Sequence, residues 1–152
     1  MGLIHADIEL ISIDDKVLAR KGYLSDDKIK TVKVSALVDS GAYMLSINEE
    51  IKMQLDLAVL DEQEAELADG TLRKVEIVGP VEIRFENRIT SVNAVVLPSN
   101  TEVLLGAIPM EDMDVLIDPK AQKLIVNPAH PYLAKKSLKS VGKESKIYLG
   151  IN

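Results

Sequence analysis

The chain has 152 residues, of which 47% are hydrophobic and 28% are charged, so it can bury a core and is too apolar to be disordered. Its formal net charge of −6 disfavours a nucleic-acid binder whose whole surface is basic. Because the sequence contains no cysteine, it can have no disulfide, thiolate zinc site or cysteine nucleophile.

The start of the sequence lacks the basic segment and the long apolar segment of a signal peptide. No stretch approaches the roughly 18 apolar residues of a membrane-spanning helix. We therefore expect a cytoplasmic protein that has no membrane partner.

The first third of the chain alternates apolar and polar residues, which predicts strands over 5–13 and 29–38 with a polar connection between them. A short strand over 44–47 is expected to follow. Asn48 has the side chain of a helix N-cap, and Glu49 and Glu50 would place acids in the first turn, where they suit the helix dipole. A short helix is therefore predicted after Asn48.

The rest of the chain is dominated by short segments of high β-propensity. Strands are predicted over 64–68, 72–77, 81–85, 89–97, 115–117 and 123–126. Asp69-Gly70 predicts a two-residue hairpin turn, and Gly79-Pro80 is expected to interrupt the strand pattern. Eight or more short strands with few helices predict an all-β fold, either a barrel or a sandwich.

The C-terminal residues 129–152 differ in charge from the rest of the chain. They contain five lysines and one glutamate, a formal charge of +4, so the preceding residues carry about −10. We expect a domain over 1–128 and a basic arm over 129–152, which is a terminal strand or a flexible segment. A solvated arm is the simpler interpretation, although its lysines leave nucleic-acid binding open.

The stretch V-S-A-L-V-D-S-G-A-Y-M-L contains the sharpest chemical feature, an acid at the end of a predicted strand. A turn at this point could hold the Asp39 carboxylate rigidly enough to act as a general base on water. The structural alternative is an ordinary Asp-Ser-Gly turn between two strands. The apolar residues on both sides favour a hydrophobic setting for the acid.

Three segments occur in an order that resembles the retropepsin-like aspartic proteases, the single-domain relatives of pepsin. They are the signature Asp39-Ser40-Gly41-Ala42, the hairpin turn Ala68-Asp69-Gly70-Thr71, and the apolar-apolar-glycine segment Leu104-Leu105-Gly106. The resemblance covers roughly residues 5–127. It implies a closed acid-protease-type β-barrel with one or two short helices, acting as a homodimer on a peptide or protein substrate.

The resemblance also implies a role for each matched residue. Asp39 would be the catalytic carboxyl, and Ser40, Gly41 and Ala42 would complete its loop. Leu104, Leu105 and Gly106 would support that loop, whereas Ala68, Asp69, Gly70 and Thr71 would form a flap that closes over the substrate. The sequence departs from the family in Tyr43-Met44, where small β-branched residues are frequent.

A homodimer also follows from the chemistry. The sequence has a single Asp-Ser-Gly, and proteolysis without a metal or a covalent nucleophile needs two carboxyls in one site. We expect no cofactor and no metal. The acids Asp112, Asp114 and Asp118 lack the glycine and the glutamate of a calcium loop, so we interpret them as surface acids.

Two other functions remain open at this point. A barrel of the same fold could be catalytically silent and serve in peptide binding or dimerisation, with Asp39 as a structural acid. Alternatively, the basic arm could be the binding element and the barrel its scaffold. Residues His5 and His130 lie far apart in the sequence and give little support for a histidine metal site or a serine triad.

Overall fold

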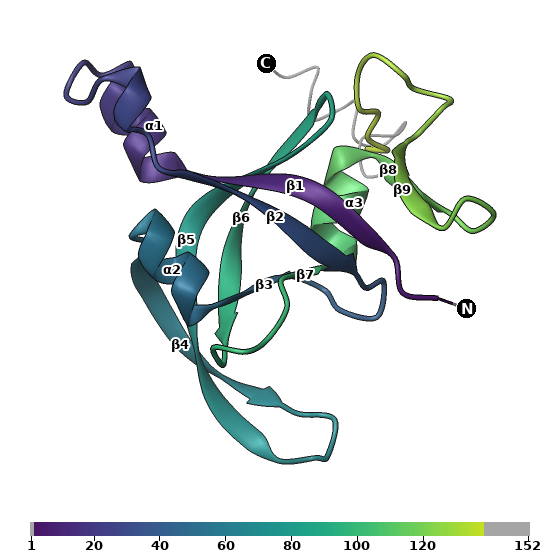
Figure 1. The fold of residues 1–152 in the computed structure, drawn as a ribbon, viewed down its shortest axis with the longest axis horizontal. Helices are drawn as coiled ribbons and strands as arrows, with labels where there is room; N and C mark the ends of the chain where they lie inside the picture. The colour runs from purple at the N-terminus through teal and green to yellow at the C-terminus, as the bar shows by residue number, and fades with distance from the viewer. Residues whose placement is uncertain (1, 139–152) are drawn as a thin grey trace, which may run out of the picture.

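The computed structural model describes residues 2–138, and β-strands dominate it (Figure 1). The strands within this part of the chain are β1 His5–Ser12, β2 Thr31–Val38, β3 Leu45–Asn48, β4 Ala58–Glu66, β5 Leu72–Phe85, β6 Arg88–Leu97, β7 Leu104–Leu105, β8 Val115–Asp118 and β9 Lys123–Val126. The described residues are therefore mostly β, which confirms the dominance of strands that the sequence predicts.

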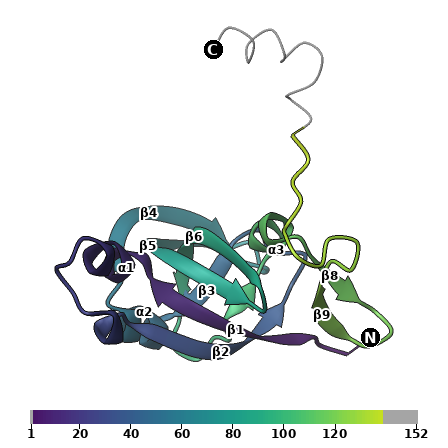
Figure 2. The same ribbon diagram turned by 90° about the horizontal axis from the view of Figure 1, so that it is seen from above.

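Seven strands form one sheet in the order β1-β2-β7-β3-β6-β5-β4. Strand β1 also pairs with β5 in antiparallel register, so hydrogen bonding continues from the β5 side of the sheet back to β1. Strands β8 and β9 form a separate antiparallel pair. This pair lies next to α3 (Ala107–Met113) in both views of the ribbon (Figures 1 and 2).

The hydrophobic core is formed mainly by aliphatic side chains of the seven-stranded sheet. Strand residues with no exposed surface come from six different strands and belong to one cluster: Leu10, Ala36, Leu45, Ile47, Val78, Val81, Ile83, Ala94 and Leu105. Helix α2 (Glu49–Leu55) contributes Ile51 and Leu55 to the same cluster. Burial of these residues supplies the main driving force for the fold.

Helix α2 begins where the sequence predicted it. The Asn48 side chain accepts a hydrogen bond of 2.9 Å from the backbone N–H of Ile51, which satisfies one of the free N–H groups of the first turn. The Asn48 amide also donates to the carbonyl of Thr101 at 3.0 Å. The cap therefore connects α2 to the segment that precedes β7.

The polar connection between the first two strands is partly helical, which the sequence patterns did not indicate. It contains α1 (Ile13–Arg20) and the 3-10 helix η1 (Asp26–Lys28). Ser12 caps α1 by accepting a bond of 3.2 Å from the N–H of Asp15. The buried Asp15 carboxylate accepts bonds from the backbone N–H and the ammonium of Lys30, both at 2.9 Å. These bonds fix α1 against the start of β2.

The expected interruption at Gly79-Pro80 was wrong, because β5 runs through it. The strand accommodates the two residues through a shift in register with β6 between Val78 and Val81. Gly79 has a φ of 149°, which other residues rarely adopt, and a Cβ atom there would lie 3.2 Å from the backbone Cα of Asn93. Both features favour glycine at this position.

The expectation of one or two short helices was too low, since residues 2–138 contain α1, α2, α3 and η1. Residues 129–138 have no helix or strand, and the chain leaves the body beside α3 (Figure 2). The terminal strand considered for 146–152 lies outside the described residues.

Candidate active site

Asp39 directly follows β2, in the loop that leads to β3. Its Oδ1 atom accepts a hydrogen bond of 2.9 Å from the N–H of Gly41, and its carbonyl accepts one of 3.1 Å from Ala42. These two bonds make a tight turn that orients the carboxylate. Asp39 is half-buried and Ser40 and Gly41 are exposed, so in the single chain the acid is not enclosed by the apolar residues around it in the sequence.

Backbone hydrogen bonds hold this loop at three points. The N–H of Asp39 donates to the carbonyl of Leu105 at 3.0 Å. The first two N–H groups of α3 donate to the loop's carbonyls, Ala107 to Ala42 at 2.7 Å and Ile108 to Tyr43 at 2.9 Å. These donors are free because the first turn of a helix has no internal partners for them. The loop is thus attached to both β7 and α3.

Gly106 makes this attachment possible. A Cβ atom at this position would lie 2.3 Å from the carbonyl oxygen of Met44 and 2.8 Å from that of Ala42. No side chain fits in this space, so the backbone of the Asp39 loop can approach α3 only at a glycine. The predicted segment Leu104-Leu105-Gly106 therefore does lie against the predicted loop, and Leu105 is fully buried beneath it.

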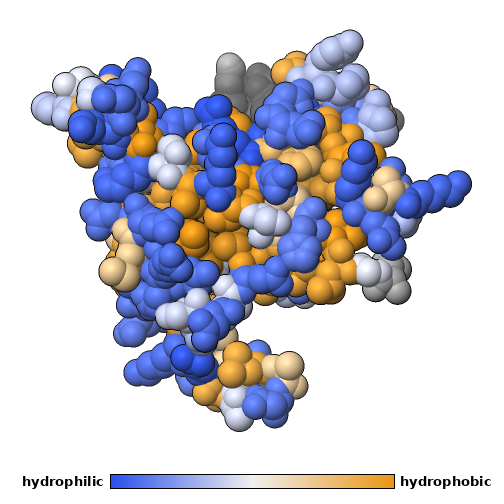
Figure 3. Space-filling view, in the orientation of Figure 1, coloured by the Kyte–Doolittle hydropathy of each residue, from blue (hydrophilic) through white to orange (hydrophobic). Residues whose placement is uncertain are grey.

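The predicted flap is the hairpin of β4 and β5, which projects from the body of the molecule (Figures 1 and 3). The expected two-residue turn was wrong. Leu67 accepts a bond from Gly70 and donates to Thr71, so the loop has three residues, with Gly70 in the left-handed region at a φ of 86°. This geometry is that of a turn followed by a bulge, in which glycine is favoured.

Asp69 stabilises the flap turn from within. Its Oδ1 atom accepts bonds from the hydroxyl of Thr71 at 2.6 Å and from the N–H of Thr71 at 3.0 Å. The hydroxyl bond, followed by the backbone bond, holds the pKa of Asp69 below its ordinary value. Ala68, like the other three turn residues, is exposed, and Figure 3 shows apolar side chains at the hairpin's tip.

The loop and the flap lie on the same side of the molecule in the view of Figure 1. Among residues 2–138, no hydrogen bond joins the flap turn 67–71 to the loop 39–43. The bulky Tyr43 that follows the signature is 75% exposed, so it does not fill the core of the single chain.

Sequence reasoning missed a polar cluster at the far end of α3. We interpreted Asp112 and Asp114 as surface acids and His130 as unaccompanied. Instead, the Asp114 carboxylate lies 2.7 Å from Nδ1 of His130 and accepts bonds of 2.9 Å from Asn127 and from the N–H of Lys135. These partners lie 13 to 21 residues after Asp114 in the sequence, so no local pattern could indicate the contacts.

The described residues contain no group of three or more histidine, cysteine, aspartate or glutamate side chains arranged to hold a metal ion. None of the helices within residues 2–138 is long and apolar enough to span a membrane.

A family model described as aspartyl protease matches residues 26–108, a span that includes both Asp39 and Gly106. The chain belongs to the retropepsin-like aspartic protease family.

The fold is similar to the crystal structure of the retroviral protease-like domain of Ddi1 from Leishmania major, with a TM-score of 0.53 and 17% sequence identity. The match covers 84% of this chain and 90% of that domain. At this identity the similarity supports the retropepsin-like fold alone. No curated protein matches the sequence.

Proposed function

We propose that the protein is an aspartic endopeptidase that acts as a homodimer, with one Asp39 from each subunit. The observation that carries this proposal is the geometry of the Asp39 loop. Its carboxylate is oriented by its own turn, and the turn is attached to β7 and α3 by three backbone bonds. Such rigidity is required of a catalytic group. The membership in an aspartic protease family supports the same reaction.

The chemistry requires two carboxyls that share one proton. The ionised carboxylate takes a proton from a water molecule, whose oxygen forms a bond to the carbon of the peptide carbonyl. The protonated carboxyl gives its proton to the carbonyl oxygen. The first carboxyl then gives the proton that it took from water to the nitrogen, the carbon–nitrogen bond breaks, and the second carboxylate takes a proton from a hydroxyl of the intermediate. The products are a carboxyl group and an amine, and the pair again shares one proton. A sequence with a single Asp-Ser-Gly can supply the second carboxyl only from another copy.

Exposed apolar side chains near the loop support a second copy at this position. Tyr43 is 75% exposed and Ile108 is 48% exposed, and both belong to segments that hydrogen bond to each other at the site. Burial of these side chains against a partner would be favourable. We propose that the two loops meet at this surface and bring the two Asp39 carboxyls together.

The other predicted residues receive supporting roles in this proposal. Ser40, Gly41 and Ala42 shape the loop, Leu104, Leu105 and Gly106 hold it, and the turn from Ala68 to Thr71 closes over an extended peptide. We further propose that β1, β2, β7, β3, β6 and β5 form a closed barrel, which the pairing of β1 with β5 supports. The domain would span 1–128, with 129–152 as a basic arm, and the protein would function in the cytoplasm.

Cleavage of an unfolded protein substrate between about pH 4 and 7, where a carboxyl pair titrates, tests the proposal. Asp39→Asn is expected to abolish cleavage, because an amide cannot replace the ionised carboxylate. Asp118→Asn serves as the control, since Asp118 also accepts backbone N–H groups but lies at the end of β8, where its partners are in the turn to β9. We expect this variant to cleave at the wild-type rate.

Equal cleavage by wild type and Asp39→Asn would contradict the proposal, and so would an absence of cleavage by the wild type at every pH. The second outcome would favour a catalytically silent barrel that binds peptides, for which the projecting flap hairpin would provide a surface.

A further inference from the structure

Asp114 occupies the position that ends α3, with a left-handed backbone at a φ of 56°. Its carboxylate accepts three bonds from the segment that follows β9: from the Asn127 amide, from His130 and from the backbone N–H of Lys135. The side chain is only 12% exposed. One carboxylate therefore connects the end of α3 to three points spread over nine residues of chain.

A buried cation faces this carboxylate from β6. The Arg88 side chain is 2% exposed, and its Nη2 atom lies 3.9 Å from Oδ2 of Asp114. The same Nη2 atom donates to the carbonyl of His130. A charged guanidinium in such a buried position requires a nearby negative charge, because an unpaired buried charge is costly. Asp114 supplies that charge and so connects β6 to the end of α3.

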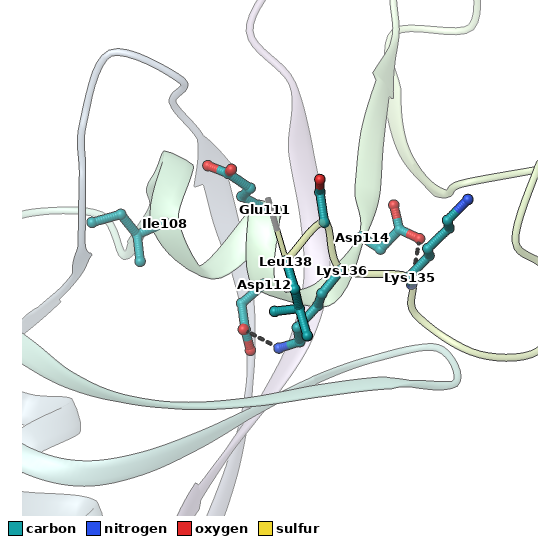
Figure 4. A pocket seen from close by; sticks show the side chains of 8 residues that line it. Ile108, Glu111, Asp112, Asp114, Lys135, Lys136 and Leu138 are labelled. Atoms are coloured by element: carbon teal, nitrogen blue, oxygen red, sulfur yellow. Dashed lines mark hydrogen bonds and ion pairs between the residues drawn. The ribbon is translucent and has the colours of Figure 1, made fainter. Parts of the chain in front are cut away.

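A second contact holds the arm on the same helix, two residues earlier in the sequence. Asp112 accepts a bond from the hydroxyl of Thr90 in β6 and forms an ion pair with the ammonium of Lys136 (Figure 4). Asp112, Asp114, Lys135 and Lys136 all line a hollow of about 480 Å³ between α3 and the arm (Figure 4). Residues 135–138 of the arm therefore lie along α3, and Leu138 is the last residue described.

The opposite end of the helix holds the Asp39 loop through the N–H groups of Ala107 and Ile108. Helix α3 has seven residues, which correspond to a rod about 10 Å long. A rod of this length moves as one unit, so a displacement of its last turn changes the position of its first N–H groups. The N–H groups of Ala107 and Ile108 cannot move closer to the loop to offset such a displacement, because Gly106 already lies in close contact with the loop.

We propose that Asp114 is a positioning residue for the reaction at Asp39. By fixing the end of α3 to β6 and to residues 127–135, it sets the position of the helix whose first N–H groups hold the Asp39 loop. The C-terminal arm is thereby coupled to the candidate active site, although no hydrogen bond joins residues 129–138 to the 39–43 loop. This inference rests on the proposed function for its catalytic consequence, but not for the coupling itself.

Amide hydrogen exchange of the full-length protein measures the coupling without any need for activity. In Asp114→Ala, we expect the N–H groups of Asp39, Ala107 and Ile108 to exchange at least about tenfold faster than in the wild type, because α3 loses its fixed end. Asp118→Ala is the matched control, since it removes a carboxylate that accepts two backbone N–H groups without contacting α3. Its exchange at the three amides should be unchanged.

Lys135→Pro provides a second, milder variant if Asp114→Ala fails to fold. Proline has no N–H group, so it removes one bond to the Asp114 carboxylate and leaves α3 intact. We expect a smaller acceleration at the same three amides. Asp114→Asn keeps an acceptor oxygen but loses the charge. Its exchange at the three amides should therefore be slower than in Asp114→Ala and faster than in the wild type.

Kinetics then test the catalytic consequence. In folded Asp114→Ala, we expect kcat to fall about tenfold and KM to stay within about twofold of the wild-type value. A displaced loop changes the position of the reacting carboxylate more than it changes the binding of the substrate. Wild-type exchange at Asp39, Ala107 and Ile108 in folded Asp114→Ala or Lys135→Pro, with faster exchange confined to the arm, would overturn the proposal. Faster exchange at these amides in a protein that never cleaves would instead retain the coupling and reject the proposed function.

Discussion

Gly106 is the residue at which packing constrains the candidate site most tightly. Three backbone atoms of the Asp39 loop, in Ala42, Tyr43 and Met44, lie within 2.8 Å of where its Cβ would be. None of them is the end of a flexible side chain, so the loop itself would have to move.

Gly106→Ala is therefore expected to lower the free energy of unfolding by about 1–3 kcal/mol, the usual cost of overpacking. It should also abolish most of the proposed activity, because the loop that carries Asp39 is displaced. Chemical denaturation and the cleavage assay measure the two effects. Gly2→Ala is the control, since its Cβ would meet only the flexible side chain of Gln122. Unchanged stability and activity in Gly106→Ala would contradict this description of the loop.

Asp114 gives the clearest expectation for pH. The backbone bond from Lys135, followed by the Asn127 amide bond, lowers the pKa of Asp114 from 3.8 to about 2, and His130 contributes in the same direction. Arg88 of β6 adds a positive charge 3.9 Å away. Because the folded-state pKa lies below the unfolded value, the stabilisation is fully present above pH 3.8 and is lost as the pH falls towards about 2.

We expect the stability difference between wild type and Asp114→Asn to be constant above about pH 5 and to shrink below it, because the asparagine cannot lose a charge. Denaturation midpoints measured from pH 5 down to pH 2 report this difference. A difference that stays the same over this whole range would show that the Asp114 charge does not stabilise the fold.

At the scale of elements, local patterns predicted most of the strands and one helix. Strand β4 begins at Ala58, earlier than the expected 64, and β5 is one strand where two were expected. Helix α2 was predictable because Asn48 and the acids after it form a local capping signal, and the structure confirms the cap. Helix α1 has a comparable signal in Ser12 and Asp15, but its only buried residue is Asp15, so its apolar pattern is weak. Helix α3 was missed because Gly106 and Pro109 disfavour a helix by propensity, whereas contacts with the Asp39 loop favour one.

The site divides in a similar way. Motif and order predicted the loop, the flap and the Leu104-Leu105-Gly106 segment, and the loop and this segment are in contact in the structure. The Asp114 cluster could not be found, because it joins α3 to an arm up to 21 residues away. Such a contact depends on where the β8–β9 pair directs the chain. No local pattern in the sequence contains that information.

For the whole molecule, the proposed function requires a second copy, because the sequence supplies one Asp-Ser-Gly and the chemistry needs two carboxyls. The exposed apolar residues Tyr43 and Ile108 provide a surface for that contact. We therefore propose that two subunits share one site, to which each contributes its Asp39.

Mixing wild-type and Asp39→Asn chains during refolding tests this claim most directly. If each site needs two Asp39 carboxyls, mixed dimers are inactive and activity follows the square of the wild-type fraction, so an equal mixture retains about one quarter of the activity. Activity that falls in simple proportion to the wild-type fraction, so that the equal mixture retains about one half, would contradict a site shared between two subunits.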